Sequence, residues 1–287
     1  EQASATRHPP LRGGEGGWGG EVRLVRCTTC GLLRLHPQPT DDELADAYAG
    51  DYAPHVRSGL SGKAKGWLER RSVRQLWRLL GLPRQVLDVG CATGDLLLAI
   101  RRAGNPHVTG VEPAEHAAEA ARGRGLDVRT GSLEEAAFPD QAFDTVILSH
   151  TLEHVRDPIA TLREIGRILR PGGALILCLP NADSIEARHL GRYWIGYDPP
   201  RHLTTFSVAT LTRAIERTGF RLVEIRHEAI GLEWAWALRH WLADHSPRLA
   251  RLTVSLHPAL IIAATPLALL GALTKRSGRI RVIGNGH

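Results

Sequence analysis

Two glycines, Gly90 and Gly94, follow an apolar run and stand directly before a helical pattern of residues. Glycine allows a tight turn and a close approach of the backbone to a ligand. A helix N-terminus adds free N–H groups and the positive end of a dipole. The spacing therefore predicts a strand, a turn and a helix that together bind a nucleotide-like cofactor.

The spacing of this loop disagrees with the common phosphate-binding loops. A dinucleotide loop reads G-x-G-x-x-G, but residue 92 is alanine, and a Walker loop needs lysine where Asp95 stands. Asp88 and Asp95 place negative charge at both ends of the loop. Two carboxylates oppose a polyphosphate and favour a ligand with a positive centre.

The stretch Leu87–Asp95 resembles the first motif of the class I S-adenosylmethionine-dependent methyltransferases. Later signals follow in the family's order, over residues 85–228, and include an H-x-x-E-H signature at His150–His154 that is typical of one large branch. The resemblance implies S-adenosylmethionine as the cofactor, with Glu112 accepting hydrogen bonds from its ribose hydroxyls. It implies these cofactor-binding residues: Asp88, Gly90, Cys91, Ala92, Gly94, Glu112, Pro113, Ser132, Leu133 and Ser149.

Candidate catalytic residues lie in two segments. The sulfonium methyl is already activated, so transfer mainly needs in-line placement of a nucleophile and, for some acceptors, a base. We favour His202, in the loop 192–207, as general base, with His150 and His154 as further candidates. Tyr193 and Tyr197 of the same loop are expected to line the substrate pocket. A purely structural role for the histidines and for this loop stays open.

Strand and helix patterns alternate from residue 85, which predicts a parallel sheet covered on both faces. The fold class is α/β, a Rossmann-like doubly wound sheet of seven strands in which the last strand is antiparallel. Strands are expected at 86–89, 107–111, 127–130, 145–149, 174–179, 222–227 and 279–283, with the last one beside 222–227. Helices are expected at 95–103, 114–123, 157–169 and 208–219, and residues 170–173 (Arg-Pro-Gly-Gly) are expected to stop the third of them.

We divide the chain into three parts. Residues 1–60 form a small N-terminal module with a flexible leader over 1–20, a cysteine-pair knuckle and a lid helix that Thr40 caps and that carries Tyr48 and Tyr52. Residues 61–228 and 279–287 form the methyltransferase core, beginning with an amphipathic helix over 66–80. Residues 229–278 form a helical insertion or cap.

The pair Cys27 and Cys30, followed by Gly31, has the shape of a zinc knuckle. Structural zinc needs four ligands, and only His8 and His36 stand near this pair in the sequence. A possible structural zinc at Cys27 and Cys30, a metal-free pair, and a partner pair in a missing start segment are the alternatives. The module is similar to a cysteine-bearing N-terminal module of bacterial methyltransferases, some of which act on sugars or natural products.

Residues 252–274 contain no charged side chain. This length could span a bilayer, but Pro258 and Pro266 interrupt it. A spanning helix and a hairpin that contacts the membrane surface or a lipid-linked substrate are alternatives. We favour a packed helical cap or a dimer face.

The composition limits which binding partners and which cellular compartment we expect. The net charge of +6 comes almost wholly from arginine, and no basic run interleaved with aromatic residues suggests nucleic acid. Four cysteines are too few for a disulfide scaffold and fit a reducing cytoplasm, with a peripheral membrane position as an alternative. The sequence shows no signal peptide, and because it begins at Glu1 and has no methionine, we expect a start segment to be missing.

The sequence thus predicts a methyltransferase that uses S-adenosylmethionine to methylate an oxygen or carbon of a small molecule, such as a sugar or secondary metabolite. Two other classes of protein remain as alternatives. One is a non-catalytic cofactor-fold module that binds membrane or nucleic acid. The other is an NAD(P)-dependent oxidoreductase, which the glycine spacing disfavours.

Overall fold

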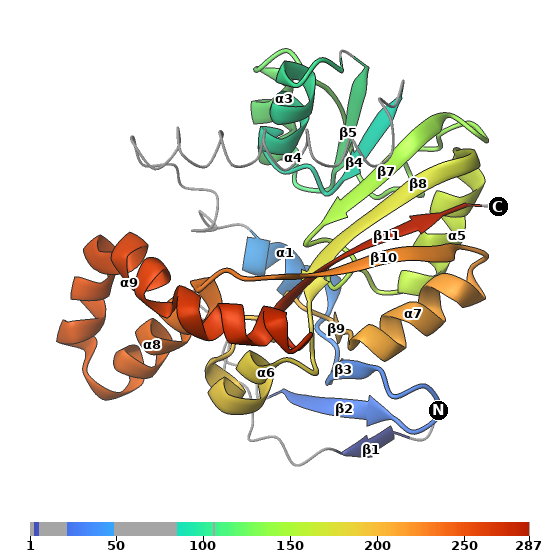
Figure 1. Cartoon of the computed structure of the whole chain (residues 1–287). Helices are drawn as coiled ribbons and strands as arrows, with labels where there is room; N and C mark the ends of the chain where they lie inside the picture. Colours follow the sequence, from blue (N-terminus) through green and yellow to red (C-terminus); the bar gives the residue numbers. More distant parts are fainter. Residues whose placement is uncertain (1–2, 6–21, 49–84, 106, 287) are drawn as a thin grey trace.

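The computed structural model describes residues 3–5, 22–48, 85–105 and 107–286. The predicted helix over 66–80, Tyr52, His8 and most of the leader lie outside the described residues. The described elements form two sheets, with a pair of helices between the last two strands of the larger one (Figure 1).

The larger sheet confirms the predicted fold class. Within the described residues this sheet has seven strands, in the order β10-β11-β8-β7-β4-β5-β6. All neighbours pair in parallel except β11, which is antiparallel to both β10 and β8. The bounds are β4 Val86–Val89, β5 Val108–Glu112, β6 Asp127–Thr130, β7 Phe143–Ser149, β8 Leu169–Pro180, β10 Arg221–Glu228 and β11 Arg279–Asn285.

Helices cover both faces of this sheet, as a doubly wound fold requires. On one face α3 (Asp95–Arg102) and α4 (Glu115–Arg122) pack in a core with Val86, Val108 and Ile147. On the other face the core is formed with α5 (Pro158–Ile168) and α7 (Val208–Arg217). The central strands are therefore buried on both sides, which explains their near-continuous apolar sequence.

The ends of α5 show how closely the sequence marks an element. Asp157 accepts hydrogen bonds from the N–H groups of Ile159 and Ala160, and Pro158 occupies the first turn, so the helix begins where predicted. Its end differs in one respect. The chain passes directly into β8, so residues 170–173, predicted as a stop between helix and strand, already belong to the strand where its pairing with β7 is irregular.

The N-terminal segments form a second, antiparallel sheet in the order β1-β2-β3-β9. Its strands are β1 (Ala3–Ala5), β2 (Arg23–Cys27), β3 (Leu33–His36) and β9 (Thr204–Thr205). The prediction of a flexible leader was wrong for residues 3–5, because the unpaired backbone groups along the edge of β2 can bind any extended segment, whatever its side chains. Since β9 comes from the loop 192–207, this loop is fixed at one end by the N-terminal sheet.

The N-terminal sheet shares a core with the segment after β8. Leu24 and Leu35 pack with Trp194 and Tyr197, and all four side chains are at most 3% exposed. The chain between β8 and Trp194 contains α6 (Ile185–Leu190) and a short 3₁₀ helix at Gly191–Tyr193. Helix α1 (Asp41–Tyr48) follows β3 and begins with the predicted Thr40 cap, which is reciprocated by Glu43.

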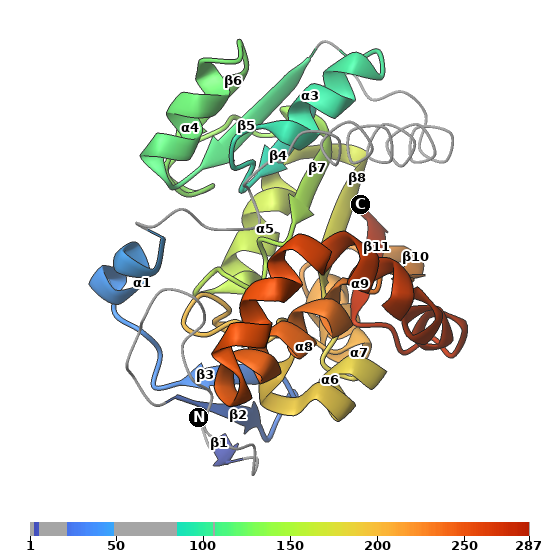
Figure 2. The same ribbon diagram turned by 90° about the vertical axis from the view of Figure 1, so that its left-hand side faces the viewer.

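Between β10 and β11 stand α8 (Leu232–His245) and α9 (Pro247–Leu273), which pack against each other beside the N-terminal sheet and the large sheet (Figures 1 and 2). Among the described residues, α9 is the only helix long and apolar enough to span a membrane, and 11% of its apolar window is buried. The expectation of a packed cap was therefore wrong for α9, because its large side chains face outward.

Candidate active site

The predicted cofactor loop joins β4 to α3. Gly90 and Gly94 have φ angles of +74° and +79°, which favour glycine. A Cβ at Gly90 would lie 2.5 Å from Oγ1 of Thr151, and one at Gly94 would lie 2.2 Å from Cδ1 of Leu126. The two glycines therefore serve close packing as well as backbone conformation.

Glu112, at the end of β5, holds this loop from the next strand. Its Oε2 accepts a hydrogen bond from the N–H of Ala92 at 2.8 Å, and its Oε1 accepts one from the N–H of Ala114 at 3.0 Å. Each carboxylate oxygen retains a second acceptor position. Burial raises the pKa of Glu112, whose side chain is 8% exposed. A diol with two hydroxyl donors would fit the acceptors that remain.

Asp88 lies in β4 below the loop and is 2% exposed. Its Oδ1 has no hydrogen-bond partner, and burial, together with the nearby charge of Glu112, raises its pKa to about 8. Two adjacent buried carboxylates and one unsatisfied oxygen suit a ligand that carries hydrogen-bond donors and a positive centre. The residues present thus fit the predicted cofactor.

The other predicted cofactor residues occupy different environments. Cys91 is buried in the core, and its N–H already binds the carbonyl of Val111. Leu133 is also a core residue, whereas the Ser132 side chain accepts a hydrogen bond from the N–H of Glu135. Pro113 is exposed and Ser149 is half-buried at the end of β7. The structure brings Asp88, Ala92 and Glu112 together and assigns Cys91 and Leu133 to packing.

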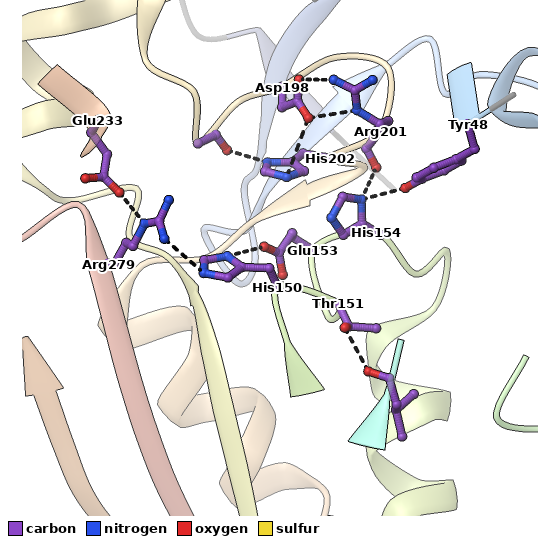
Figure 3. Close-up of polar contacts among 12 residues, drawn as sticks. Tyr48, His150, Thr151, Glu153, His154, Asp198, Arg201, His202, Glu233 and Arg279 are labelled. Carbon is purple, nitrogen blue, oxygen red and sulfur yellow. Dashed lines mark hydrogen bonds and ion pairs between the residues drawn. The ribbon is translucent and has the colours of Figure 1, made fainter. Parts of the chain in front are cut away.

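A second group of polar side chains begins directly after β7 (Figure 3). His150, with φ +58°, lies at this strand end, and its N–H binds the carbonyl of Cys178 in β8. Its Nδ1 is 3.3 Å from Oε1 of Glu153. A carboxylate accepts only, so Nδ1 of His150 carries the proton and Nε2 is the basic nitrogen. The side chain of His150 is 35% exposed, whereas that of Glu153 is 1% exposed.

The loop 192–207 closes over Glu153. Leu203 and Thr204 donate their N–H groups to the carbonyl of Glu153, at 2.9 and 3.1 Å. Within the loop, Arg201 makes a bidentate ion pair with Asp198, at 2.7 and 2.9 Å, and this pairing lowers the pKa of Asp198 in spite of its burial. The loop is therefore braced internally and anchored at its end.

His202 and His154 meet edge to face beneath this loop, with ring centroids 4.6 Å apart. Nδ1 of His202 is 2.9 Å from the carbonyl oxygen of Gly196, and Nδ1 of His154 is 3.1 Å from that of Arg201. A carbonyl oxygen accepts only, so both histidines carry their proton on Nδ1 and offer the Nε2 lone pair. The hydroxyl of Tyr48, from α1, also lies 2.8 Å from Nδ1 of His154.

Glu153, His154 and His202 form the buried cluster of the site. One potential ligand atom from each lies within 4.8 Å of the others, and Oε2 of Glu153 has no hydrogen-bond partner. Burial and the neighbouring His202 lower the pKa of His154 to about 4, whereas the hydrogen bond from His150 and the three histidines lower that of Glu153 in spite of burial. Three converging acceptors need a donor between them, such as a proton or a divalent cation.

Two residues that the sequence motifs did not indicate reach this group from the other side. Arg279, in β11, approaches Nε2 of His150 at 3.5 Å through Nη1 and forms an ion pair with Glu233 of α8 (Figure 3). The alternation of apolar and basic residues in β11 places Arg279 and Arg281 on one face. That pattern was available, but no local signal indicates that His150 lies opposite.

The structure places the predicted pocket tyrosines away from His150. The hydroxyl of Tyr193 donates to Asp244 of α8 at 3.2 Å, and Tyr197 is 3% exposed in the core beneath the N-terminal sheet. Both are attached to neighbouring elements because the loop that carries them runs between the N-terminal sheet and α8. Of the predicted catalytic residues, the structure brings His150, His154 and His202 together and separates Tyr193 from them.

Cys27 and Cys30 form the predicted tight turn, in which the N–H of Gly31 binds the carbonyl of Cys27. The backbone N–H of Cys30 lowers the pKa of Cys27, which suits a thiolate ligand. Within the described residues, however, no third histidine, cysteine or carboxylate joins this pair in a group that could hold a metal. The pair supplies two of the four ligands of structural zinc.

Comparison with known proteins agrees with this geometry. The family described as "Methyltransferase domain" matches residues 64–225. A protein of Mycolicibacterium smegmatis, named a probable S-adenosylmethionine-dependent methyltransferase, is 30% identical over 167 residues, which are 54% of this chain and 60% of that protein. The ubiquinone biosynthesis O-methyltransferase of Xanthomonas oryzae pv. oryzae is 40% identical over 104 residues, which are 34% of this chain and 43% of that enzyme. The chain thus matches about half the length of these relatives.

The fold has a counterpart among solved structures. A SAM-dependent methyltransferase from Archaeoglobus fulgidus superposes with a TM-score of 0.54 and 21% identity, over 77% of this chain and 94% of the other. At 21% identity, this similarity shows a shared fold and nothing more.

Proposed function

The chain belongs to the methyltransferase-domain family, and from this premise we propose that it transfers a methyl group from S-adenosylmethionine to a small-molecule acceptor. The observation that carries the proposal is the position of two different groups at the carboxyl ends of three adjacent parallel strands. Glu112 at the end of β5 and Asp88 near the end of β4 offer acceptors for the cofactor, and His150, directly after β7 on the other side of β4, offers a partly exposed base.

The cofactor side is proposed to bind S-adenosylmethionine through the loop 90–94, with Glu112 accepting from the ribose hydroxyls. When bound, this cofactor supplies an electrophilic methyl group on a positively charged sulfur. Burial and the charge of Glu112 keep Asp88 protonated in the free protein, and a bound cation would favour its ionised form beside Glu112. Ser132, Ser149 and Pro113 are proposed to border the cofactor through the loops after β6, β7 and β5.

For proton transfer we propose His150 in preference to His202. The His202 side chain is 7% exposed and lies under the loop 192–207, whereas that of His150 is 35% exposed. When an acceptor oxygen takes the methyl group that the bound cofactor would supply, His150 would accept the proton of that oxygen at Nε2. Glu153 orients the imidazole through Nδ1, and the acceptor hydroxyl must replace Arg279, which lies 3.5 Å from Nε2 as a donor.

His154 and His202 are proposed to position this machinery. Each offers a ligand atom within 4.8 Å of Glu153, and they link α1 and the loop 192–207 to it. Because the pKa of His154 is lowered to about 4, this histidine is neutral at neutral pH beside the ionised Glu153.

We propose that the acceptor carries a hydroxyl group, as in a sugar or secondary metabolite. The relative in Xanthomonas oryzae is named for O-methylation, and a general base beside the strand end suits a hydroxyl that must lose its proton. Methylation of carbon is the alternative and would be distinguished by the bond found in the product.

The free cysteines among the described residues fit a reducing compartment, so we propose that the reaction takes place in the cytoplasm.

Structural zinc at Cys27 and Cys30 stays a prediction outside this mechanism, because two ligands do not complete a site. Elemental analysis of the purified full chain, with a Cys27→Ser/Cys30→Ser variant as control, measures it directly. Less than stoichiometric zinc in the parent would refute the predicted zinc site.

Calorimetric titration with S-adenosylmethionine tests the proposed function. Glu112→Gln removes the charge from the acceptor of the ribose hydroxyls and should weaken binding about ten- to a hundredfold. Glu115→Gln, three residues later on the exposed start of α4, is the matched control and should bind like the parent. A parent protein that gives neither heat nor a thermal shift with the cofactor would refute the function.

A further inference from the structure

Helix α9 has the reverse of the burial pattern expected for a helix of a soluble protein. Its buried residues are the small or short ones, Ala250, Thr253, Ala268 and Gly271. Its large apolar residues are exposed by 47–75% of their surface: Leu249, Leu252, Val254, Leu256, Ile262, Leu267, Leu269, Leu270 and Leu273. Exposed apolar surface on this scale marks a surface that something covers.

The connections of α9 exclude a simple bilayer crossing. Both ends of the α8–α9 hairpin continue into strands of the same sheet, β10 and β11, so a crossing by α9 would need a return crossing by α8. Helix α8 has 14 residues, which is about 21 Å and shorter than the hydrocarbon core. It also carries Arg239 and Asp244. The hairpin can therefore lie on a membrane but does not span one.

The charges around the exposed face decide what covers it. Arg248 and Arg251 stand in the first turns of α9, and Lys275 and Arg276 follow its end, all with exposed side chains. No aspartate or glutamate occurs after Asp244 in the sequence. A second copy on this face would bring the basic ends of two hairpins near each other, whereas anionic headgroups would neutralise them.

The other helix of the hairpin, α8, also carries exposed apolar residues. Trp241 is 45% exposed and stacks on His245, with 4.5 Å between ring centroids. Leu238, one turn earlier, is 41% exposed. An exposed tryptophan in a hairpin with apolar and basic side chains suits the boundary between headgroups and acyl chains.

We propose that the α8–α9 hairpin docks on the surface of an anionic lipid bilayer. The exposed leucines of α9 enter the headgroup–acyl boundary, and the four basic residues at its ends contact acidic headgroups. The docking does not depend on methyl transfer. It does place the site near the membrane, because Glu233, in the first turn of α8, is paired with Arg279 beside His150 (Figure 3).

Vesicle co-sedimentation of the full chain tests the docking. The parent should bind vesicles of phosphatidylglycerol and phosphatidylcholine, and binding to phosphatidylcholine alone should be at least tenfold weaker. Leu249→Gln/Leu252→Gln/Leu256→Gln, on one side of α9, should reduce the partition coefficient at least tenfold. Val223→Gln, at a 51% exposed apolar residue of β10 outside the hairpin, is the matched control and should bind like the parent.

The charge contribution is tested separately. Arg248→Glu/Arg251→Glu should lower binding to the anionic vesicles more than tenfold. Arg217→Glu, at an exposed arginine of α7, should change it little. An unchanged thermal transition and unchanged cofactor binding in all variants would show that they are folded.

Two results would overturn the proposal. One is a parent protein that does not sediment with anionic vesicles. The other is a triple glutamine variant that sediments like the parent. If the parent is instead a dimer by sedimentation equilibrium, does not bind vesicles, and becomes monomeric with the glutamine substitutions, the face is an interface between two copies.

Discussion

The proposed cofactor side, around Asp88 and Glu112, and the proposed acceptor side, around His150 and Glu153, are assembled from different spans of the chain. On the cofactor side, the hydrogen bond between Glu112 and Ala92 joins the end of β5 to the loop after the adjacent strand β4, 20 positions apart in the chain. On the acceptor side, contacts of His150 with Arg279, of His154 with Tyr48 and of Arg201 with Ala47 join residues 129, 106 and 154 positions apart. One side is a local motif, and the other depends on the docking of several independent segments.

The two sides also differ in their electrostatics. The cofactor side has two buried carboxylates whose pKa values burial raises. The acceptor side has one buried carboxylate among three histidines, with its pKa lowered. A cofactor side made for one cationic ligand can serve many acceptors, because the segments that form the acceptor side can change without altering the loop 90–94.

Removal of the proposed base should give the largest effect and should separate the two sides. His150→Ala should lower kcat about 10²- to 10⁴-fold, because the acceptor loses its proton acceptor in the transition state. The affinity for S-adenosylmethionine, measured by calorimetry, should stay within twofold, since the cofactor residues are untouched. His189→Ala, at an exposed histidine of α6, is the control. An equal loss of cofactor affinity in His150→Ala would contradict the division.

The pH dependence of stability should have opposite signs on the two sides. His154, with a pKa of about 4, is neutral in the folded state, so the unfolded chain binds more protons between pH 4 and 6.5. The contribution of His154 to stability should therefore fall by roughly 3 kcal/mol as the pH falls through this range. Asp88, with a pKa of about 8, is protonated in the folded state, so its contribution is lost as the pH rises from 3.8 to 8.

Chemical denaturation between pH 4 and 8 measures both contributions. Between pH 4 and 6.5 the two contributions oppose each other, so His154→Phe should make stability increase more steeply as the pH falls through this range, and Asp88→Asn should flatten the curve between pH 6.5 and 8. The two variants act as controls for each other. Parallel curves for the parent and both variants would show that neither group titrates as its burial requires.

Gly90, in the cofactor loop, packs against Thr151, which directly follows His150 of the acceptor side. Gly90→Ala would force alanine into a left-handed conformation and place its Cβ 2.5 Å from Oγ1 of Thr151, so we expect a destabilisation of about 2–3 kcal/mol. Unlike His150→Ala, this variant should weaken both cofactor binding and turnover. Adding Thr151→Ala removes the clashing atoms and should restore part of the stability, although it also removes the hydrogen bond to Val89. Full additivity of the two changes would show that the contact is not the cause.

The sequence predicted the cofactor side better than the acceptor side for a physical reason. The glycine spacing, the flanking acids and Glu112 lie within βαβ units, whose geometry is nearly fixed once the strands and helices are recognised. The pairing of Arg279 with His150, the strand β9 and the burial of Tyr197 depend on which loops meet across the molecule. Periodicity indicates the face on which a side chain lies, but not the segment that covers it.

The apolar segment near the C-terminus shows the same limit. Its composition predicted a helix with an unusual environment, but a packed cap, a dimer face and a membrane surface require the same kind of residues. Only the structure shows that the small residues of α9 face the protein and the large ones face outward.

The smallest expected effect concerns the docking of α1 on the histidine cluster. Tyr48→Phe removes the hydroxyl 2.8 Å from Nδ1 of His154 and should destabilise the protein by about 0.5–1.5 kcal/mol, the net contribution of one hydrogen bond. Tyr193→Phe, whose hydroxyl binds Asp244 on the hairpin, removes a comparable bond far from the cluster. Only Tyr48→Phe should change the pH dependence of turnover, because only Tyr48 contacts a titratable residue of the acceptor side. If both variants leave the pH profile unchanged and alter stability equally, α1 serves packing alone, and the acceptor side is limited to the segments after β4.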